Sequence, residues 1–258
     1  MSMKARCVFG GLLVMAAVLM LSGSCAMATS GGGGGGEGGG GAAAVVNREA
    51  DRALALFREG DYARAIKVMG AVLERLPEDR KGEGNYIIGS SRLRTGDYEA
   101  GREFSLVALS KYYKGETTLW GDREKVRTLA ATDLSYHASD KGDYEIIGRV
   151  EGIVGEDIKL DRVLVREPNG VLAGRTRLSS ILSFYKARAL KNAKKAQEAL
   201  ELLKTMAFDT GKIFVDGKVT GLTEAVEKLT AEVAAMAARF FFRAVLRPLR
   251  GSALSYRL

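Results

Sequence analysis

Few side chains in this sequence could support catalysis or bind a metal ion. The chain has one histidine, His137, and two cysteines, Cys7 and Cys25, whereas a structural zinc site needs four ligands that are mostly of these two types. The acidic residues at 156–161 lack the alternating ligands and the closing glutamate of a calcium loop. The sequence also lacks the nucleophile elbow, the phosphate loop and the dinucleotide fingerprint. We therefore predict that the protein is not an enzyme and needs no metal or cofactor.

The first residues of the chain, 1–24, predict a secretory signal peptide. Lys4 and Arg6 precede an apolar run at 7–21, and small residues follow at 22–24. The apolar run is shorter than the roughly 18 residues that a membrane-spanning helix needs. We therefore expect the chain to be exported and this leader to be removed.

Cys25 is a candidate for lipid attachment. The sequence around it resembles the lipobox of bacterial lipoproteins, with Ser22 in the place where a branched apolar residue is usual. This interpretation predicts a protein of the cell envelope that is lipid-anchored to a bacterial membrane, at its periplasmic face or at the cell surface. In the alternative, an ordinary signal peptidase cuts after Ala28, at the A-x-A pattern of 26–28, and the protein is secreted or soluble in the periplasm.

Residues 25–44 predict a flexible tether behind the anchor. Glycines at 31–36 and 38–41 cannot bury apolar surface, and ordering them costs the most backbone entropy. By the square-root rule for Gly-rich chains, residues 26–41 would have a root-mean-square reach of about 20 to 24 Å. Such a spacer would hold a folded body clear of the lipid headgroups.

The composition is moderately basic and offers no disulfide to the exported body. The chain has 39 Lys and Arg against 31 Asp and Glu, and this excess is spread along the sequence. Both cysteines lie in or next to the leader, so stability must come from apolar burial. Because the protein is predicted to leave the cytoplasm, we expect no nucleic-acid partner. The expected partners are a protein or peptide, and the membrane through the lipid anchor.

Two stretches share a pattern centred on the triplet Gly-Asp-Tyr. The triplets occur at 60–62 and 96–98, 36 positions apart. The glycine is suited to end one helix in the left-handed conformation, and the aspartate is suited to cap the next helix. Each triplet therefore predicts two helices joined by a tight turn, in residues 53–77 and 86–110.

Small residues recur in both stretches where the two helices of a pair should cross most closely. Ala53 and Gly89 occupy this place on the first helices, and Ala65 and Gly101 occupy it on the second. With these features, residues 46–110 resemble two tandem tetratricopeptide repeats, whose usual period is about 34 residues.

The resemblance implies an array of helical hairpins that binds a protein or peptide in a groove lined by the first helix of each pair. The lysine and asparagine residues with which chaperone-binding members clamp a carboxylate are missing, and Arg92 stands where a large apolar residue is usual. The residues that would line the groove are Asn47, Leu54, Phe57, Glu83, Tyr86, Ser90 and Leu93. In the alternative, these side chains pack against the tether-proximal or C-terminal helices.

A third Gly-Asp-Tyr triplet begins at Gly142, and the residues before it, 122–139, place apolar side chains on one helical face. The residues after the triplet are rich in glycine and β-branched types, with a turn signal at 168–170. We therefore predict helical repeats over 45–143, interrupted by a small β element over 144–178.

Helix is predicted again in a C-terminal region at 179–250. One helix is expected over 179–207 and another over 223–246, with a short hairpin at 213–219 between them. The predicted fold class is mainly α: tetratricopeptide-like helical hairpins with a small β insertion and C-terminal helices.

Two functions are consistent with these patterns. The first is an envelope-anchored, tetratricopeptide-type scaffold or assembly factor that binds other proteins. The second is a solute-binding accessory lipoprotein that partners a periplasmic transporter and holds a ligand between the repeats and the C-terminal helices. An open groove would favour the first function, and an apolar tunnel would favour the second.

Replacing Cys25 with alanine is expected to release the protein from membranes, because acylation of this residue would provide the hydrophobic anchor once the leader is removed. Partition of wild type and variant between detergent and aqueous phases measures the effect. A wild-type protein that is already aqueous, with Thr29 as its first residue, would show the lipoprotein interpretation to be wrong.

Overall fold

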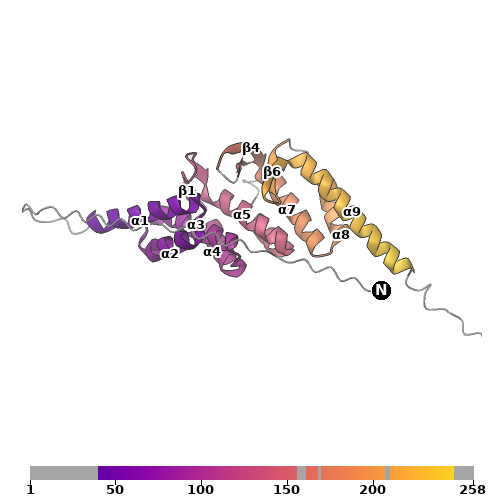
Figure 1. Cartoon of the computed structure of the whole chain (residues 1–258), viewed down its shortest axis with the longest axis horizontal. Helices are drawn as coiled ribbons and strands as arrows, with labels where there is room; N and C mark the ends of the chain where they lie inside the picture. Colours follow the sequence, from indigo (N-terminus) through magenta and orange to yellow (C-terminus); the bar gives the residue numbers. More distant parts are fainter. Residues whose placement is uncertain (1–39, 156–160, 168–169, 207–209, 247–258) are drawn as a thin grey trace, which may run out of the picture. The chain divides into compact units, whose positions relative to one another are not determined.

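The computed structural model describes residues 40–155, 161–167, 170–206 and 210–246. In this part of the chain the protein is mainly helical, with three small two-stranded antiparallel sheets (Figure 1). The predicted mainly α class is therefore confirmed. The predicted signal peptide, Cys25 and the tether up to residue 39 lie outside the described residues.

Eight of the described helices form four consecutive pairs. The pairs are α1 (Gly40–Arg58) with α2 (Tyr62–Val72), α3 (Glu78–Arg94) with α4 (Tyr98–Ser110), α5 (Val126–Lys141) with α6 (Tyr144–Val154), and α7 (Leu178–Asn192) with α8 (Ala196–Thr205). A short 3₁₀ turn at Leu73–Arg75 follows α2. The last helix, α9 (Leu222–Leu246), is not followed by a second helix in the described residues.

The same turn joins the two helices of every pair. At its centre one residue has a left-handed backbone, which is Gly60 (φ 80°), Gly96 (φ 88°), Gly142 (φ 75°) or Lys194 (φ 64°). The next residue donates its N–H to a carbonyl of the first helix: Asp61 to Leu56 (2.9 Å), Asp97 to Arg92 (2.9 Å), Asp143 to Ala138 (2.9 Å) and Lys195 to Leu190 (2.8 Å). The first two Gly-Asp-Tyr triplets thus end and begin helices as predicted, because glycine reaches this conformation without steric cost. The third triplet makes the same turn, although a helix was predicted only before it.

The fourth pair corrects the prediction of one helix over 179–207. The helix is interrupted at Ala193–Lys195, where Lys194 takes the left-handed conformation. Ala187 and Ala199 occupy the places of Ala53 and Ala65 in the first pair, and both are fully buried. A lysine in the left-handed region carries no sequence signal as clear as glycine, which explains why the turn escaped prediction.

The third pair corrects the prediction of a β element over 144–178. Residues 144–154 form α6 instead, and the strands cover only 162–177. Asp143 caps α6, since its side chain accepts the N–H of Ile146 at 3.1 Å. Ile147, Val150 and Val154 lie on the buried face at helical spacing, so packing against the neighbouring helices outweighs their β propensity.

The C-terminal bound predicted for the tether is wrong. Helix α1 begins at Gly40, so the described end of the predicted tether, residues 40–44, is helical. Alanines at 42–44 have the highest helix propensity of any residue type.

A β-hairpin precedes each of the helices α5, α7 and α9. The hairpins are β1 (Glu116–Thr117) with β2 (Glu124–Lys125), β3 (Arg162–Arg166) with β4 (Leu172–Arg177), and β5 (Lys212–Val215) with β6 (Lys218–Gly221). The first residue of the following helix donates its N–H to the carbonyl just before the hairpin: Val126 to Gly115, Leu178 to Asp161 and Leu222 to Gly211, each at 2.9 Å. The hairpin predicted at 213–219 is confirmed, whereas β1–β2 was not predicted.

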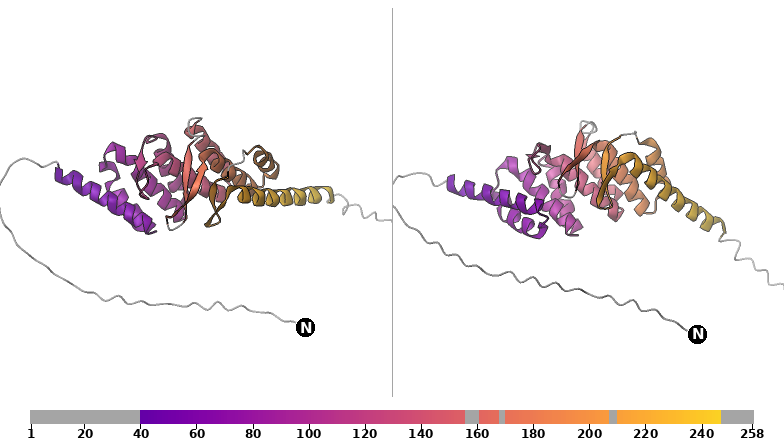
Figure 2. Two further views of the ribbon diagram at one scale, coloured as in Figure 1. Left: turned by 90° about the horizontal axis from the view of Figure 1, so that it is seen from above. Right: turned by 45° about the horizontal axis from the view of Figure 1, so that its top comes forward.

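The helix pairs and hairpins share a continuous core. Helices α1, α3, α5 and α7 contact one another in a row, and each second helix contacts the first helix of the next pair. Strands β3 and β4 both contact β5, so these two hairpins lie side by side (Figure 2). The largest fully buried side chains are Tyr185, Phe184, Met69, Ile87, Leu109, Leu119 and Leu134. In the described part of the chain, no helix combines the length and apolarity needed to cross a membrane.

Replacing Gly89 with alanine tests the close crossing within the second pair. A Cβ atom at this position would lie 2.7 Å from Ser105 Oγ and 2.9 Å from Ser105 N. We expect the free energy of unfolding to fall by about 1 to 3 kcal/mol, as measured by urea denaturation.

Gly70 provides the matched control on helix α2. Nothing lies within 4 Å of a Cβ added there, so Gly70→Ala should raise the free energy of unfolding by about 0.5 to 1 kcal/mol through helix propensity. Equal effects of the two substitutions would contradict the close crossing.

Candidate functional site: an aromatic pocket on the first helices of the pairs

A cavity of about 190 Å³ opens on the row formed by the first helices of the four pairs. Helices α1, α3, α5 and α7 line one side of it, and strands β3 and β5 line the other. Its aromatic lining consists of Phe57, Tyr62, Tyr86, Trp120, Tyr136, Tyr185 and Phe214. We refer to this cavity as the aromatic pocket.

The carboxylate of Asp133 on α5 is the polar centre of the aromatic pocket. Its Oδ2 accepts hydrogen bonds from three side chains of α3: Ser90 Oγ at 2.5 Å, Tyr86 Oη at 3.2 Å and Arg94 Nη2 at 3.2 Å. Residues 86, 90 and 94 are spaced by four and therefore share one face of α3. A single carboxylate thus joins α3 to α5 and holds three donor side chains of α3 at the pocket.

Arg94 combines this ion pair with contacts to aromatic rings. Its guanidinium lies 5.7 Å from the ring centroid of Phe57 and 5.6 Å from that of Tyr62. Burial acts to lower the pKa of Arg94, but the charge of Asp133, the neighbouring Tyr86 and Tyr62 and the hydrogen bond to Asp133 together outweigh this effect, so the pKa is raised. A third of the Arg94 side chain remains exposed, so a permanent cation is accessible at the wall of the pocket.

The aromatic rings around Arg94 support one another. The ring centroid of Phe57 lies 5.5 Å from that of Tyr62, 6.1 Å from that of Tyr86 and 6.4 Å from that of Trp120. Tyr86 is buried, and its pKa is raised well above the usual value by burial and by the charge of Asp133. Its hydroxyl is therefore a hydrogen-bond donor at neutral pH. The three distances between the ring of Phe57 and its neighbours fall in the range in which tilted and edge-on rings attract each other.

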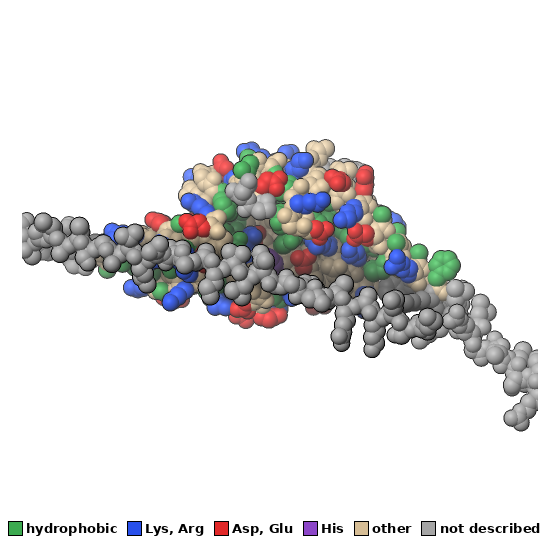
Figure 3. All heavy atoms as spheres, viewed as in Figure 1, with side chains coloured by type: hydrophobic (Ala, Val, Ile, Leu, Met, Phe, Trp, Pro, Cys, Tyr) green, Lys and Arg blue, Asp and Glu red, His purple; other side chains and the backbone are tan. Residues whose placement is uncertain are grey.

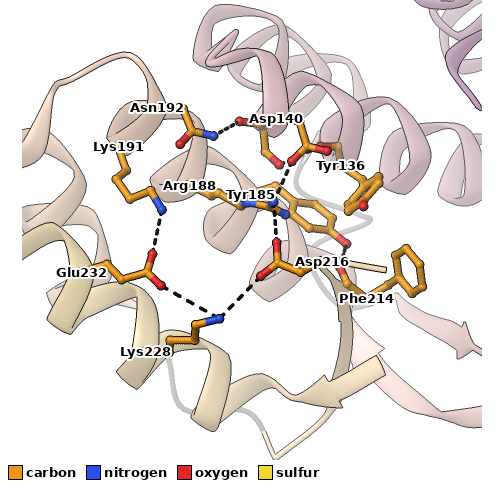
Figure 4. A network of polar contacts seen from close by, with 11 residues as sticks. Tyr136, Asp140, Tyr185, Arg188, Lys191, Asn192, Phe214, Asp216, Lys228 and Glu232 are labelled. Atoms are coloured by element: carbon orange, nitrogen blue, oxygen red, sulfur yellow. Dashed lines mark hydrogen bonds and ion pairs between the residues drawn. The ribbon is translucent and has the colours of Figure 1, made fainter. Parts of the chain in front are cut away.

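The opposite wall is positioned by a polar network that Figure 4 shows in detail. Tyr185 on α7 donates its hydroxyl to the carbonyl of Phe214 at 2.7 Å. Arg188, one turn further along α7, pairs with Asp140 of α5 at 2.7 Å and with Asp216 of the β5–β6 turn at 2.8 Å. These bonds hold strand β5 against both helices and so bring Phe214 to the pocket.

A buried ion pair forms the edge of the pocket nearest β2 and β3. Glu124 of β2 lies 3.5 Å from Arg166 of β3, and Arg166 also pairs with Asp122 at 2.6 Å. Burial raises the pKa of Glu124, and the charge of Arg166 opposes the rise. Gly170, which precedes β4, lies against Trp120, because a Cβ atom added to it would come within 2.9 Å of the indole ring.

Three of the residues predicted to line a groove meet at this site. Phe57 and Tyr86 line the pocket, and Ser90 donates a hydrogen bond to its central carboxylate. All three side chains are buried, so they line or support a cavity and do not form the surface of an open groove.

The other four predicted residues have different surroundings. Leu93 packs inside its own helix pair, where a Cβ atom on Gly101 would come within 2.8 Å of it. Glu83 accepts hydrogen bonds from Thr117 Oγ1 (2.5 Å) and Arg80 Nη2 (2.9 Å) and thereby anchors β1. Asn47 accepts a hydrogen bond from Arg80 at 3.3 Å, and Leu54 borders a separate hollow.

Sequence reasoning missed Asp133, Arg94 and the aromatic residues on the far wall. Arg94 and Asp133 are 39 positions apart, and no local pattern links them. One signal was present, since Asp133 and Tyr136 lie on the first helix before the third Gly-Asp-Tyr triplet. A groove extended to that helix would have included them.

The described residues offer little for metal binding. They contain no group of three His, Cys, Asp or Glu side chains that could hold a metal ion. His137 lies edge-on to Tyr136, with 5.0 Å between ring centroids. Burial lowers its pKa, with Asp133 opposing the shift.

Comparison of the chain with known protein families, with curated proteins and with solved structures finds no match.

Replacing Asp133 with asparagine tests the central carboxylate. The change leaves Arg94 without its counter-ion and weakens two further hydrogen bonds. We expect a loss of about 1 to 3 kcal/mol in the free energy of unfolding. Glu201→Gln removes an exposed ion pair with Lys204 and should change stability by less than about 0.5 kcal/mol in the same denaturation experiment. Similar small losses in both variants would contradict the role given to Asp133.

Proposed function

We propose that the protein is an envelope-anchored scaffold that binds another protein and has no enzymatic activity. The observation that carries this proposal is the aromatic pocket, which draws its lining from the first helices of all four pairs. A lipid on Cys25 would hold the protein at the membrane, and the glycine-rich segment would act as a spacer.

Support for a tetratricopeptide-type array comes from the repeated turn. In the four described helix pairs, a residue at the same place in the turn has a left-handed backbone, and the residue after it donates the same backbone hydrogen bond. Three of these turns contain Gly-Asp-Tyr. In tetratricopeptide repeats the partner lies along the first helices, which is the side on which the pocket opens here. The β-hairpins before α5, α7 and α9 depart from simple tandem repeats and add a second wall.

The composition of the pocket favours a polypeptide partner. Aromatic residues and arginine dominate the energetic centres of protein interfaces, and Phe57, Trp120 and Arg94 bring both kinds together. The cavity volume of about 190 Å³ is below the range of about 300 to 1,000 Å³ usual for small-molecule sites. It suits one or two side chains of a partner. On the face shown in Figure 3, acidic and basic side chains are interspersed, which does not favour a nucleic-acid partner.

A second candidate function is that of a solute-binding accessory lipoprotein beside a transporter. The observation in its favour is that strands β3 and β5 form a second wall, so the pocket is partly enclosed. A small ligand would then occupy the space between the helices and the hairpins.

A photo-crosslinking pair on α1 tests the proposed function. Arg58 lines the pocket and is exposed, whereas Arg52 is exposed but does not line it. Benzoylphenylalanine introduced at position 58 in producing cells should yield a discrete conjugate with an envelope protein, and the same group at position 52 should not. Conjugates of equal yield from both positions, or from neither, would contradict the proposal. A small molecule retained in native mass spectrometry, with no protein conjugate, would favour the solute-binding function.

A further inference from the structure

Strand β3 has one edge that no described strand covers. Among the described residues β3 pairs with β4 alone, in regular antiparallel register from Arg162↔Arg177 to Val165↔Gly174, and the register shifts before Arg166↔Leu172, where β4 carries one extra residue. Every strand has two hydrogen-bonding edges, so the second edge of β3 is available for pairing.

The backbone groups on this edge can be assigned from the hydrogen bonds at both ends of the hairpin. The carbonyl of Asp161 accepts from Leu178, and the N–H of Glu167 donates to Val171, so both residues turn their backbone groups toward β4. In an antiparallel ladder the backbone N–H and C=O groups of successive residues point alternately toward and away from the partner strand. The N–H and C=O of Leu164 and Arg166 therefore point away from β4, and no hydrogen bond of the described residues engages them.

This free edge borders the aromatic pocket. The five consecutive residues Val163–Glu167 all line it. Side chains of a strand alternate between its two faces, so an unbroken run of lining residues means that the strand presents its edge to the cavity.

A second hollow lies beside β3. It has a volume of about 330 Å³ and is lined by residues 122–125 and 161–164, by Thr128 and Leu129 of α5 and by Arg175 of β4. Ion pairs span it at both ends, from Lys125 Nζ to Asp161 (2.8 Å) and from Arg166 Nη2 to Asp122 (2.6 Å). Long side chains thus bridge the two segments that contain β2 and β3 beside this hollow, to which we refer as the slot.

We propose that the Leu164 edge of β3 binds an extended segment of a partner protein as a third strand, with one aromatic or large apolar side chain of that segment in the aromatic pocket. This inference rests on the proposed function and specifies the form of the partner. Unpaired N–H and C=O groups at strand spacing are complemented by another extended backbone, which a helical segment cannot offer because its own backbone bonds are internal. The aromatic pocket then selects the side chain of the partner, and the edge of β3 forms hydrogen bonds with the partner's backbone.

The experiment uses the full chain and a displayed library of random seven-residue peptides as the probe. Enriched peptides are synthesised, and their dissociation constants are measured for wild type, Leu164→Pro and Leu164→Ala. Proline is tolerated on an edge strand where its missing N–H faces away from the partner strand. Leu164→Pro should weaken binding about tenfold through the lost hydrogen bond and the ring in the slot, whereas Leu164→Ala should stay within about threefold. Circular dichroism and thermal unfolding verify that both variants remain folded.

N-methylated peptides provide a second measurement on unaltered protein. Methylation at every second position should weaken binding about tenfold, and methylation at the positions between should not, because a strand turns alternate N–H groups to its neighbour. Peptides that lose affinity with Phe214→Ala but bind Leu164→Pro as wild type would overturn the strand proposal and leave the pocket function standing. A selection that yields no peptide dependent on either position would overturn both.

Discussion

The carboxylate of Asp133 is the constraint around which the aromatic pocket is built. It receives three donors from one face of α3 and so fixes the distance and rotation between α3 and α5. A partly buried carboxylate is stable only with such donors, and a partly buried guanidinium needs a negative partner. Satisfying both demands places Arg94 against Phe57 and Tyr62. The aromatic wall of the first helix pair thereby becomes continuous with the helices of the third and fourth pairs.

Repetition supplies the scaffold that makes this possible. The turn with a left-handed residue occurs four times, and the bond that closes a β-hairpin onto the next helix occurs three times. Each first helix therefore reaches the same side of the array, and each hairpin follows at an equivalent place. The hairpins change what a row of helices can do, because β3 and β5 turn an open surface into a pocket with backbone edges. The network of Arg188 with Asp140 and Asp216 shows how the second wall is held in position without contributing to the cavity itself.

Local signals in the sequence were sufficient for part of this architecture and insufficient for the rest. Gly-Asp-Tyr predicted the turns of the first two pairs because glycine and aspartate have direct conformational roles there, and at the third triplet it predicted only the helix that precedes the turn. Lys194 adopts the same left-handed conformation without such a signal, so the fourth pair was merged into one helix. Helix α6 was misread because its β-branched residues favour strands locally, and tertiary packing decides otherwise. Of the site, Phe57, Tyr86 and Ser90 could be predicted from the repeat, whereas Asp133 meets its partners only after folding, across 39 to 47 positions of sequence.

Trp120 offers the most direct test of the claim that the aromatic pocket is the binding site. It is the only tryptophan of the chain and lines the pocket, so protein labelled with 5-fluorotryptophan gives one fluorine resonance that reports on this place alone. The chemical shift of that resonance is measured in the full chain before and after addition of the partner recovered from envelope extract. We predict that the resonance moves on binding and moves less when Phe214 is replaced by alanine. A partner that binds the wild-type protein and leaves the chemical shift unchanged would contradict it.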